Sequence, residues 1–346
     1  MGVSLDNLIL HIFRMKSISV DEENLERFTG VQRRTIDRFK ESHKSPYIIP
    51  IPEKADVTLE DAFNDSLKQL LEQSKGKKVC LLWSGGIDST LVFCALVKSG
   101  IFFYVFMDNN SRNEYPMLYD KIVNKEFNCD YRLFNERGLV DLLSLKDDKD
   151  ILFVTGEIGD QLTGSMVTMR FTYEQRNIMM QEVIEKDLFM KPYEKPEYEN
   201  KYKPILTGKM NGTESAIKFC EKSIYEFLGT NRKNTTLSEF LWALNFIFKY
   251  MLVLLRLHQV GLYFTGDRQN TYHFYNTVKF QQWSMSHYKE NCAYIKETDY
   301  KMPFKEYIYK FLGDDHYMNS KLKEPSLSIS FYHDGVKKVP TKAKIL

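Results

Sequence analysis

Short apolar runs alternate with amphipathic stretches through the first half of the chain. The apolar runs, which predict buried strands, lie at 79–83, 101–107, 131–134 and 151–155. The amphipathic stretches, which predict helices, lie at 58–71, 91–98 and 114–127. Thr58 can cap the first of these helices, with Asp61 three residues further on. Strands that alternate with helices of this length predict an α/β fold, with a parallel sheet and helices on both of its faces.

The pattern changes after residue 155, where longer helices are expected. The stretch 237–259 predicts a long and largely apolar helix, and the stretch 274–285 carries an aromatic stripe that is more typical of a core than of a ligand platform. Asn245, Lys249 and Arg256 interrupt the apolar stretch. A charge near the middle of a membrane span costs about 2.5–3.5 kcal/mol, so a buried helix is expected there and no membrane association.

A loop rich in glycine and hydroxyl groups, Ser84-Gly85-Gly86-Ile87-Asp88-Ser89-Thr90, separates the first predicted strand from a helix. Backbone N–H groups and the helix dipole favour a bound phosphate at such a junction. The glycines allow close approach to the anion, and the hydroxyls of Ser84, Ser89 and Thr90 add donors. Asp88 adds a carboxylate, which predicts a metal ion between it and the phosphate. An ordinary strand-to-helix turn is the alternative explanation.

A second junction of this kind follows the strand at 151–155. Its sequence, Thr155-Gly156-Glu157-Ile158-Gly159-Asp160-Gln161, carries two carboxylates three residues apart, so both can face one cleft. Ligands in parallel sheets bind beyond the carboxyl ends of the strands, where Ser84, Asp108 and Thr155 are expected to emerge. The chain contains neither Gly-x-x-x-x-Gly-Lys-Ser/Thr nor Gly-x-Gly-x-x-Gly. The two better-known nucleotide-binding signatures therefore do not account for these loops.

The hexapeptide Ser-Gly-Gly-Ile-Asp-Ser resembles the pyrophosphate-binding loop of the PP-loop ATP pyrophosphatases. With the second junction, it resembles the synthetase domain of asparagine synthetase and its relative β-lactam synthetase. A third similarity is the helical stretch that begins at Lys301-Met302, followed by Lys321-Leu322-Lys323-Glu324 with a spacing that differs by about one residue. The resemblance spans about residues 58–324 and implies an adenine nucleotide alpha hydrolase-like fold.

The resemblance also implies roles for individual residues. It implies that ATP and Mg²⁺ are bound and that the pyrophosphate lies on a set of loop residues: Ser84, Gly85, Gly86, Asp88, Ser89, Thr90 and Gly156. Asp88 and Asp160 would bind Mg²⁺. Glu157 would act as an acid, a base or a carboxylate that orients the nucleophile. Lys323 would stabilise negative charge on the phosphates, although it could equally be an exposed surface lysine.

The sequence departs from the family pattern at several positions. The family's glutaminase domain begins with a catalytic cysteine, whereas Gly2 follows Met1 here and about 57 residues precede the similar region. We expect no glutamine hydrolysis within the chain, so ammonia, a separate glutaminase or another amine would supply the nucleophile. Ile158 replaces a glycine and Gln161 replaces a glutamate in the second junction. The segment between Phe134 and Ile151 is also shorter than in asparagine synthetase. Because that segment and the following loop shape the acceptor pocket in the family, aspartate is doubtful as the substrate.

The expected organisation is an N-terminal segment of unassigned role (1–57) and an asparagine-synthetase-like domain (58–346). The domain comprises a nucleotide-binding α/β part (58–165) and a mainly helical part that completes the site (166–346). The expected function is an ATP-dependent, AMP-forming ligase that adenylates a small-molecule carboxylate and transfers it to ammonia or an amine. The alternatives are a PP-loop enzyme that adenylates a nucleobase or tRNA carbonyl, and a catalytically decayed nucleotide-binding protein.

Composition limits the partners and the compartment. The 346 residues include 48 basic and 46 acidic side chains, a formal charge of +2, which gives no general attraction for nucleic acid. The five cysteines form no Cys-x-x-Cys pair. Reduced thiols and an N-terminus that lacks the order of a secretory signal predict a cytoplasmic protein.

Overall fold

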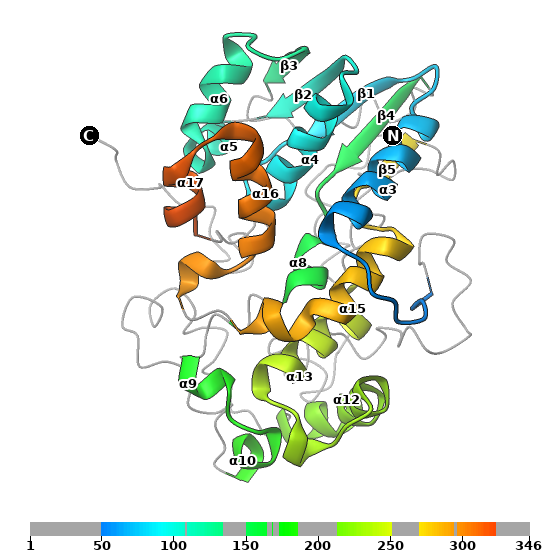
Figure 1. Ribbon diagram of the computed structural model, residues 1–346, viewed down its shortest axis with the longest axis vertical. Helices are drawn as coiled ribbons and strands as arrows, with labels where there is room; N and C mark the ends of the chain where they lie inside the picture. Colours follow the sequence, from blue (N-terminus) through cyan, green and yellow to red (C-terminus); the bar gives the residue numbers. More distant parts are fainter. Residues whose placement is uncertain are drawn as a thin grey trace, which may run out of the picture.

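A five-stranded parallel sheet is the centre of the computed structural model (Figure 1). The structure describes residues 50–107, 109–133, 150–164, 168, 173–185, 213–250, 270–293 and 296–322. The strands are β1 (Lys78–Leu82), β2 (Phe103–Met107), β3 (Cys129–Leu133), β4 (Ile151–Thr155) and β5 (Thr271–His273). They are ordered β3-β2-β1-β4-β5, and every neighbouring pair is parallel. The predicted α/β fold with a parallel sheet is therefore confirmed.

Helices dominate the chain after β4, as predicted (Figure 1). The described α-helices are α3 (Leu59–Gln73), α4 (Ile87–Ser99), α5 (Asn109–Glu114), α6 (Pro116–Val123), α8 (Gly159–Thr163), α9 (Tyr173–Arg176), α10 (Met180–Glu185), α12 (Thr213–Leu228), α13 (Leu237–Leu244), α15 (Val278–Cys292), α16 (Met302–Leu312) and α17 (Asp315–Ser320). Short 3₁₀ turns lie at Arg232–Asn234 and Glu297–Asp299, and a π-helix, η4, spans Asn245–Lys249. Among the described residues, no helix has the length and apolarity needed to cross a membrane.

The predicted cap of α3 is present. The backbone N–H of Asp61 donates to Thr58 Oγ1 at 3.1 Å, and the Asp61 carboxylate accepts from the backbone N–H of Thr58 at 3.3 Å. This reciprocal pair satisfies donors that have no partner within the helix. The apolar side chains of Phe63, Leu67 and Leu70 lie one turn apart on the buried face, and α3 packs against α15.

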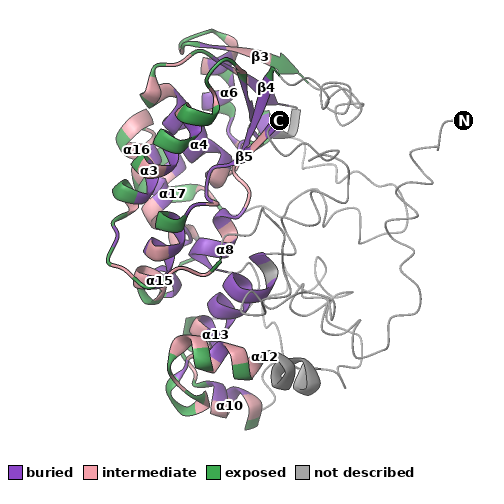
Figure 2. Cartoon of the chain, turned by 90° about the vertical axis from the view of Figure 1, so that its right-hand side faces the viewer, coloured by how far each residue is buried: buried purple, intermediate pink, exposed green. Residues whose placement is uncertain are grey.

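The side chains of the strands alternate between two apolar clusters. Val79 and Leu81 of β1 join the main core, whereas Cys80 points to a second, smaller cluster with Phe106 and Phe153 on the other face of the sheet. Helices α3, α4 and α16 lie on one side of the sheet (Figure 2). Helices were predicted on both faces. The connection between β3 and β4, residues 134–149, lies outside the described residues, so the prediction for the second face stays untested.

Three elements differ from the prediction. The helix expected over 114–127 is shorter: α6 begins at Pro116, and Glu114 ends the preceding helix α5, because Pro116 has no N–H to donate and is favoured in the first turn of a new helix. The helix expected over 237–259 begins as predicted, but it changes to a π-helix at Asn245, and residues 251–269 lie outside the description. Strand β5 was not predicted because three residues are too few to show a period.

Candidate active site

The strand order reverses between β1 and β4, and this is where the two predicted loops meet. The chain runs from β1 outward to β2 and β3, then returns to the other side of β1 with β4. Leu82 of β1 is paired in register with Thr155 of β4, so the loops after these strands leave the same edge of the sheet side by side. Parallel sheets bind ligands in the crevice at such a reversal. Asp108, expected at the same edge, lies outside the described residues.

The first loop makes a tight turn that requires glycine at position 85. Gly85 has a φ of 77°, and a Cβ there would lie 2.5 Å from the carbonyl oxygen of Ser111 and 2.6 Å from Glu114 Cβ. Helix α4 then begins at Ile87, four residues earlier than predicted. Asp88 therefore lies in the first turn of the helix. The backbone N–H groups of that turn have no acceptor within the helix and face the loop.

The three hydroxyl residues of the first loop have different surroundings. Ser89 Oγ accepts from the backbone N–H of Ser84 at 3.2 Å and donates to the carbonyl of Gly86 at 3.2 Å, which closes the turn. Ser84 is exposed at the mouth of the loop. Thr90, also predicted to bind the nucleotide, is buried and faces the core, where its Oγ1 accepts from Trp83 Nε1 at 3.1 Å. Thr90 thus supports the loop from behind.

The second loop packs against the first with almost no space between the backbones. A Cβ at Gly156 would lie 2.7 Å from the backbone nitrogen of Ser89, and a Cβ at Gly159 would lie 2.5 Å from Cγ of Asp88. The intervening Ile158 is buried and has a φ of 79°, a left-handed conformation that is costly for a β-branched residue. Short α8 follows and carries Asp160.

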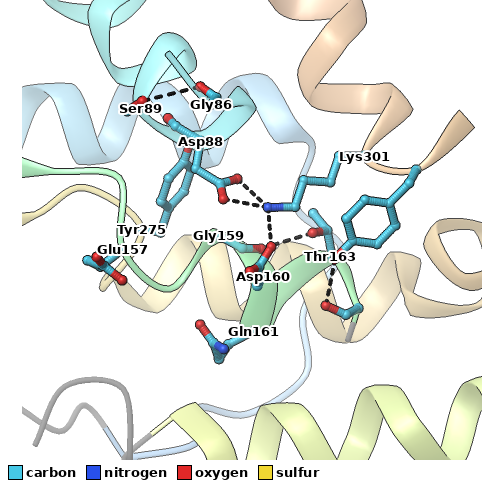
Figure 3. Close-up of polar contacts among 12 residues, drawn as sticks. Gly86, Asp88, Ser89, Glu157, Gly159, Asp160, Gln161, Thr163, Tyr275 and Lys301 are labelled. Atoms are coloured by element: carbon cyan, nitrogen blue, oxygen red, sulfur yellow. Dashed lines mark hydrogen bonds and ion pairs between the residues drawn. The ribbon is translucent and has the colours of Figure 1, made fainter. Parts of the chain in front are cut away.

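Asp88 and Asp160 converge on one buried cation, the ammonium group of Lys301 (Figure 3). Lys301 Nζ lies 2.5 Å from both carboxylate oxygens of Asp88 and 2.6 Å from Asp160 Oδ1. The Lys301 side chain is 0% exposed, while those of Asp88 and Asp160 are 15% and 27% exposed. Lys301 also has a left-handed backbone, with a φ of 59°, immediately before α16. The two loops are therefore joined by an ion pair with a residue from the far end of the chain.

The two carboxylates fit the ligand set of a nucleotide-bound magnesium ion. Both reach the same nitrogen atom, so they are close enough to share one cation. Mg²⁺ is usually held by one or two carboxylates together with substrate phosphates and water, and not by a cage made of protein alone. No group of three or more metal-ligating side chains occurs in the part of the chain that the structure describes. The donor set suits a metal that arrives with phosphate.

Glu157 lies apart from this ion cluster. Its side chain lies at a distance from Asp88, Asp160 and Lys301 (Figure 3). Its backbone N–H donates to Thr155 Oγ1 at 3.4 Å, and that hydroxyl lies 2.8 Å from Nδ1 of His273 at the end of β5. Glu157 is therefore on the same loop as Asp160 but outside the ion cluster.

The lysine beside the first loop is Lys321. Its ammonium group forms an ion pair with the Glu114 carboxylate and donates to the Glu114 carbonyl at 2.9 Å. Glu114 in turn flanks Gly85. Lys323, the predicted catalytic lysine, lies outside the described residues, and its role stays a prediction.

Asn245 supports the second loop from below and was not predicted as a site residue. Its Nδ2 donates to the carbonyl oxygens of Asp160 at 2.6 Å and Gly164 at 3.1 Å, and its Oδ1 accepts from Gln161 Nε2 at 3.4 Å. Asn245 is fully buried at the start of π-helix η4, and π-helical turns are frequent at functional sites. A polar residue in an otherwise apolar stretch was the sequence signal for it.

Tyr275 holds the start of α4 from the core side. Its hydroxyl donates to the backbone carbonyl of Asp88 at 2.8 Å. Burial raises the pKa of Tyr275 well above its usual value, so the phenol stays protonated and keeps this donor.

No protein-family model matches the chain, and no curated protein matches it significantly. The geometry of the site itself is therefore the basis of the proposals below.

Proposed function

We propose that the protein is an ATP- and Mg²⁺-dependent ligase that adenylates a carboxylate and transfers the acyl group to ammonia or an amine. One observation carries the proposal. Asp88 and Asp160, from loops at the carboxyl ends of adjacent parallel strands, converge on a single cation beside the first turn of a helix. A triphosphate and a metal ion are the ligands that suit this combination of donors and charge.

The first loop would bind the pyrophosphate part of ATP. The first-turn N–H groups of α4, the exposed position of Ser84 and the absence of side chains at Gly85 and Gly86 support this role. Asp88 and Asp160 would hold Mg²⁺, which supplies positive charge to the phosphates. The left-handed backbone at Ile158, two residues before Asp160, and at Lys301, which forms an ion pair with Asp160, is also typical of a functional site.

The reaction would proceed in two displacements. A substrate carboxylate oxygen attacks the α-phosphorus, the bond to the β-phosphate oxygen breaks, and pyrophosphate leaves. An amine then attacks the acyl carbon, AMP leaves, and the amine loses a proton. Glu157, which lies on the second loop but apart from the ion cluster, is the proposed proton acceptor. Lys323, by resemblance, and Lys321, beside the first loop, are the candidates for stabilising the leaving phosphate.

Product analysis tests the proposal. The protein is incubated with ATP, Mg²⁺ and a panel of small carboxylic acids with ammonia or amines, and the nucleotide products are separated. AMP and pyrophosphate in equal amounts, dependent on both the acid and Mg²⁺, are expected. Release of ADP and phosphate instead would exclude the proposed chemistry.

Nucleotide binding without catalysis is the second candidate. The observation in its favour is the ammonium group of Lys301, which already neutralises part of the charge on Asp88 and Asp160. Binding of ATP with equal affinity in the presence and absence of Mg²⁺, and no AMP with any acid, would favour this candidate over the ligase.

We also propose a cytoplasmic location, as expected from the cysteine pattern. In support, Cys80, Cys94, Cys129 and Cys292 are buried and unbridged.

A further inference from the structure

The ammonium group of Lys301 lies where the proposed metal ion would bind. It contacts both oxygens of Asp88 and one oxygen of Asp160 at 2.5–2.6 Å, and its side chain is wholly buried. One ammonium group between two carboxylates leaves a net charge of −1. A second cation cannot contact the same oxygens while Lys301 remains, because like charges a few ångströms apart in a buried site repel strongly.

We propose that Lys301 is the resident cation of the nucleotide-free site, and that a divalent cation binds Asp88 and Asp160 only by displacing its ammonium group. This inference rests on the metal role in the proposed function, but on none of its chemical steps. The lysine side chain has a flexible four-carbon stem, so the ammonium group can move while the backbone stays in place. The stem carries the ammonium group from the N-terminal end of α16 to the two carboxylates (Figure 3).

Displacement makes metal binding conditional on phosphate. Mg²⁺ gives up its water reluctantly and prefers several oxygen ligands. Two carboxylates whose charge is already partly neutralised by Lys301 attract Mg²⁺ alone only weakly, whereas a nucleotide brings additional phosphate oxygens and negative charge. The site is then expected to reject free divalent cations and to accept them together with a polyphosphate.

Removal of the ammonium group should allow Asp88 and Asp160 to bind a divalent cation without a nucleotide. In Lys301→Met, two carboxylates face each other without a counter-ion, and a buried charge that loses its partner is strongly destabilising. The variant should therefore be less stable than the parent, and a divalent cation should restore the lost stability. Lys301→Gln is a second neutral variant, whose amide can still donate to the carboxylates.

The experiment measures binding of Mn²⁺ to the full-length protein without nucleotide, from the loss of the electron paramagnetic resonance signal of free Mn²⁺. We expect a dissociation constant at least about tenfold lower for both Lys301 variants than for the parent. Millimolar Mg²⁺ should also raise the melting temperature of the variants more than that of the parent. Adding Asp160→Asn to Lys301→Met should abolish the gain in Mn²⁺ affinity.

Lys305→Met is the matched control. Lys305 is another fully buried lysine, one turn further along α16, but its ammonium group donates to the carbonyl oxygen of Thr298. Its removal should leave Mn²⁺ binding unchanged.

Three results would overturn the inference: tight Mn²⁺ binding by the parent without nucleotide, no gain of binding in folded Lys301 variants, or variants that remain unfolded in millimolar Mg²⁺. These results are distinct from failure of the proposed function. A protein that forms no AMP could still gain Mn²⁺ binding in Lys301→Met, and an active ligase could fail to gain it.

Discussion

Asp88 occupies the first turn of α4 and contacts both the second loop and the lysine that bridges the two loops. Its carboxylate contacts Lys301 and adjoins Gly159, and its carbonyl accepts from Tyr275. The substitution Asp88→Asn keeps the shape of the side chain but removes a negative charge and a metal ligand. We expect Mg²⁺-dependent pyrophosphate release to fall by about 100-fold or more, while the protein remains folded by circular dichroism.

The control for Asp88→Asn is Asp65→Asn. Asp65 accepts an exposed hydrogen bond from Gln69 within α3, away from the two loops, so its substitution should leave the rate unchanged. An Asp88→Asn variant as active as the parent would remove the metal role assigned to this residue.

Gly159 tests how closely the two loops must pack. A Cβ at this position would lie 2.5 Å from Asp88 Cγ, so Gly159→Ala forces the carboxylate out of its position. A displacement of about 1 Å at a reacting centre can lower the rate about 100-fold, and we expect a loss of this order in pyrophosphate release.

Gly229→Ala is the matched control for Gly159→Ala. A Cβ at Gly229 meets no atom within 4 Å, but its φ of 63° is unfavourable for alanine. The control should lose about 1–2 kcal/mol of stability with little change in rate. Equal rates for the two glycine variants would show that the close approach at Gly159 has no part in the reaction.

At the scale of elements, the short helix α8 depends on η4. Asn245→Ala removes the hydrogen bonds to the carbonyls of Asp160 and Gly164, although the Gly164 carbonyl still accepts from the Tyr300 hydroxyl at 2.9 Å. Removal of a donor from a buried carbonyl costs about 1–3 kcal/mol. Chemical denaturation should show a loss within this range. The apparent affinity for Mg²⁺, measured from the rate of pyrophosphate release, should also weaken because Asp160 is no longer fixed.

A comparison with Trp242→Phe separates these two effects of Asn245→Ala. Trp242 donates to the carbonyl of Leu162, which lies in α8 together with Asp160. That carbonyl also accepts from Ser284, so it keeps a donor in the variant. Trp242→Phe should therefore leave the Mg²⁺ dependence unaltered. A matching shift in both variants would mean that loosening of the core, and not the position of Asp160, explains the result.

The turn after α6 offers a prediction about stability alone. Lys125 is exposed and has a φ of 59°, a conformation in which glycine carries no steric cost. Lys125→Gly should raise the free energy of unfolding by about 0.5–1 kcal/mol, measured by urea denaturation. Its ion pair with Asp130 spans 3.7 Å at the surface and contributes little. Lys125→Ala, which loses the same ion pair but keeps the strained backbone, should show no gain.

The local elements were largely predictable because each strand carries its signal within a few residues. The predicted run at 151–155 coincides with β4, and Thr58 and Asp61 cap α3 as expected. The misses arise where the signal is not local. Strand β5 is short and depends on pairing with β4, and the π-helical turn at Asn245 depends on the carbonyls that it holds.

At the scale of the whole molecule, the chain brings together residues that no local pattern connects. The two loops could be predicted because glycines, hydroxyls and carboxylates follow recognisable strands. Lys301 could not be assigned to the site, because it is separated from Asp88 by 213 positions and only tertiary packing shows that its side chain is buried between two carboxylates. The same packing reveals Lys321 against Glu114, beside the first loop.

Lys305 links the stability of the whole protein to pH. Burial lowers the pKa of Lys305 from 10.5 to about 8, with a further lowering from the positive charge of Lys321 and an opposing effect from Asp299. Between these two pKa values the unfolded state binds more protons than the folded state. The free energy of unfolding should therefore rise with pH from about 8 to 10.5, and this contribution should be lost as the pH falls through 8.

Lys305→Met removes this titration, so its effect on stability should depend on pH. The difference in the free energy of unfolding between the variant and the parent should favour the variant most at pH 7. This difference should shrink as the pH approaches 10, measured by urea unfolding at several pH values. Lys98→Met provides a control of opposite sign. Its hydrogen bond with Tyr307 raises the pKa of Lys98. The stability that charged Lys98 contributes is therefore present below pH 10.5 and is lost as the pH rises above it. A difference between Lys305→Met and the parent that stays constant from pH 7 to pH 10 would mean that Lys305 titrates normally and that its burial does not disfavour the charged form.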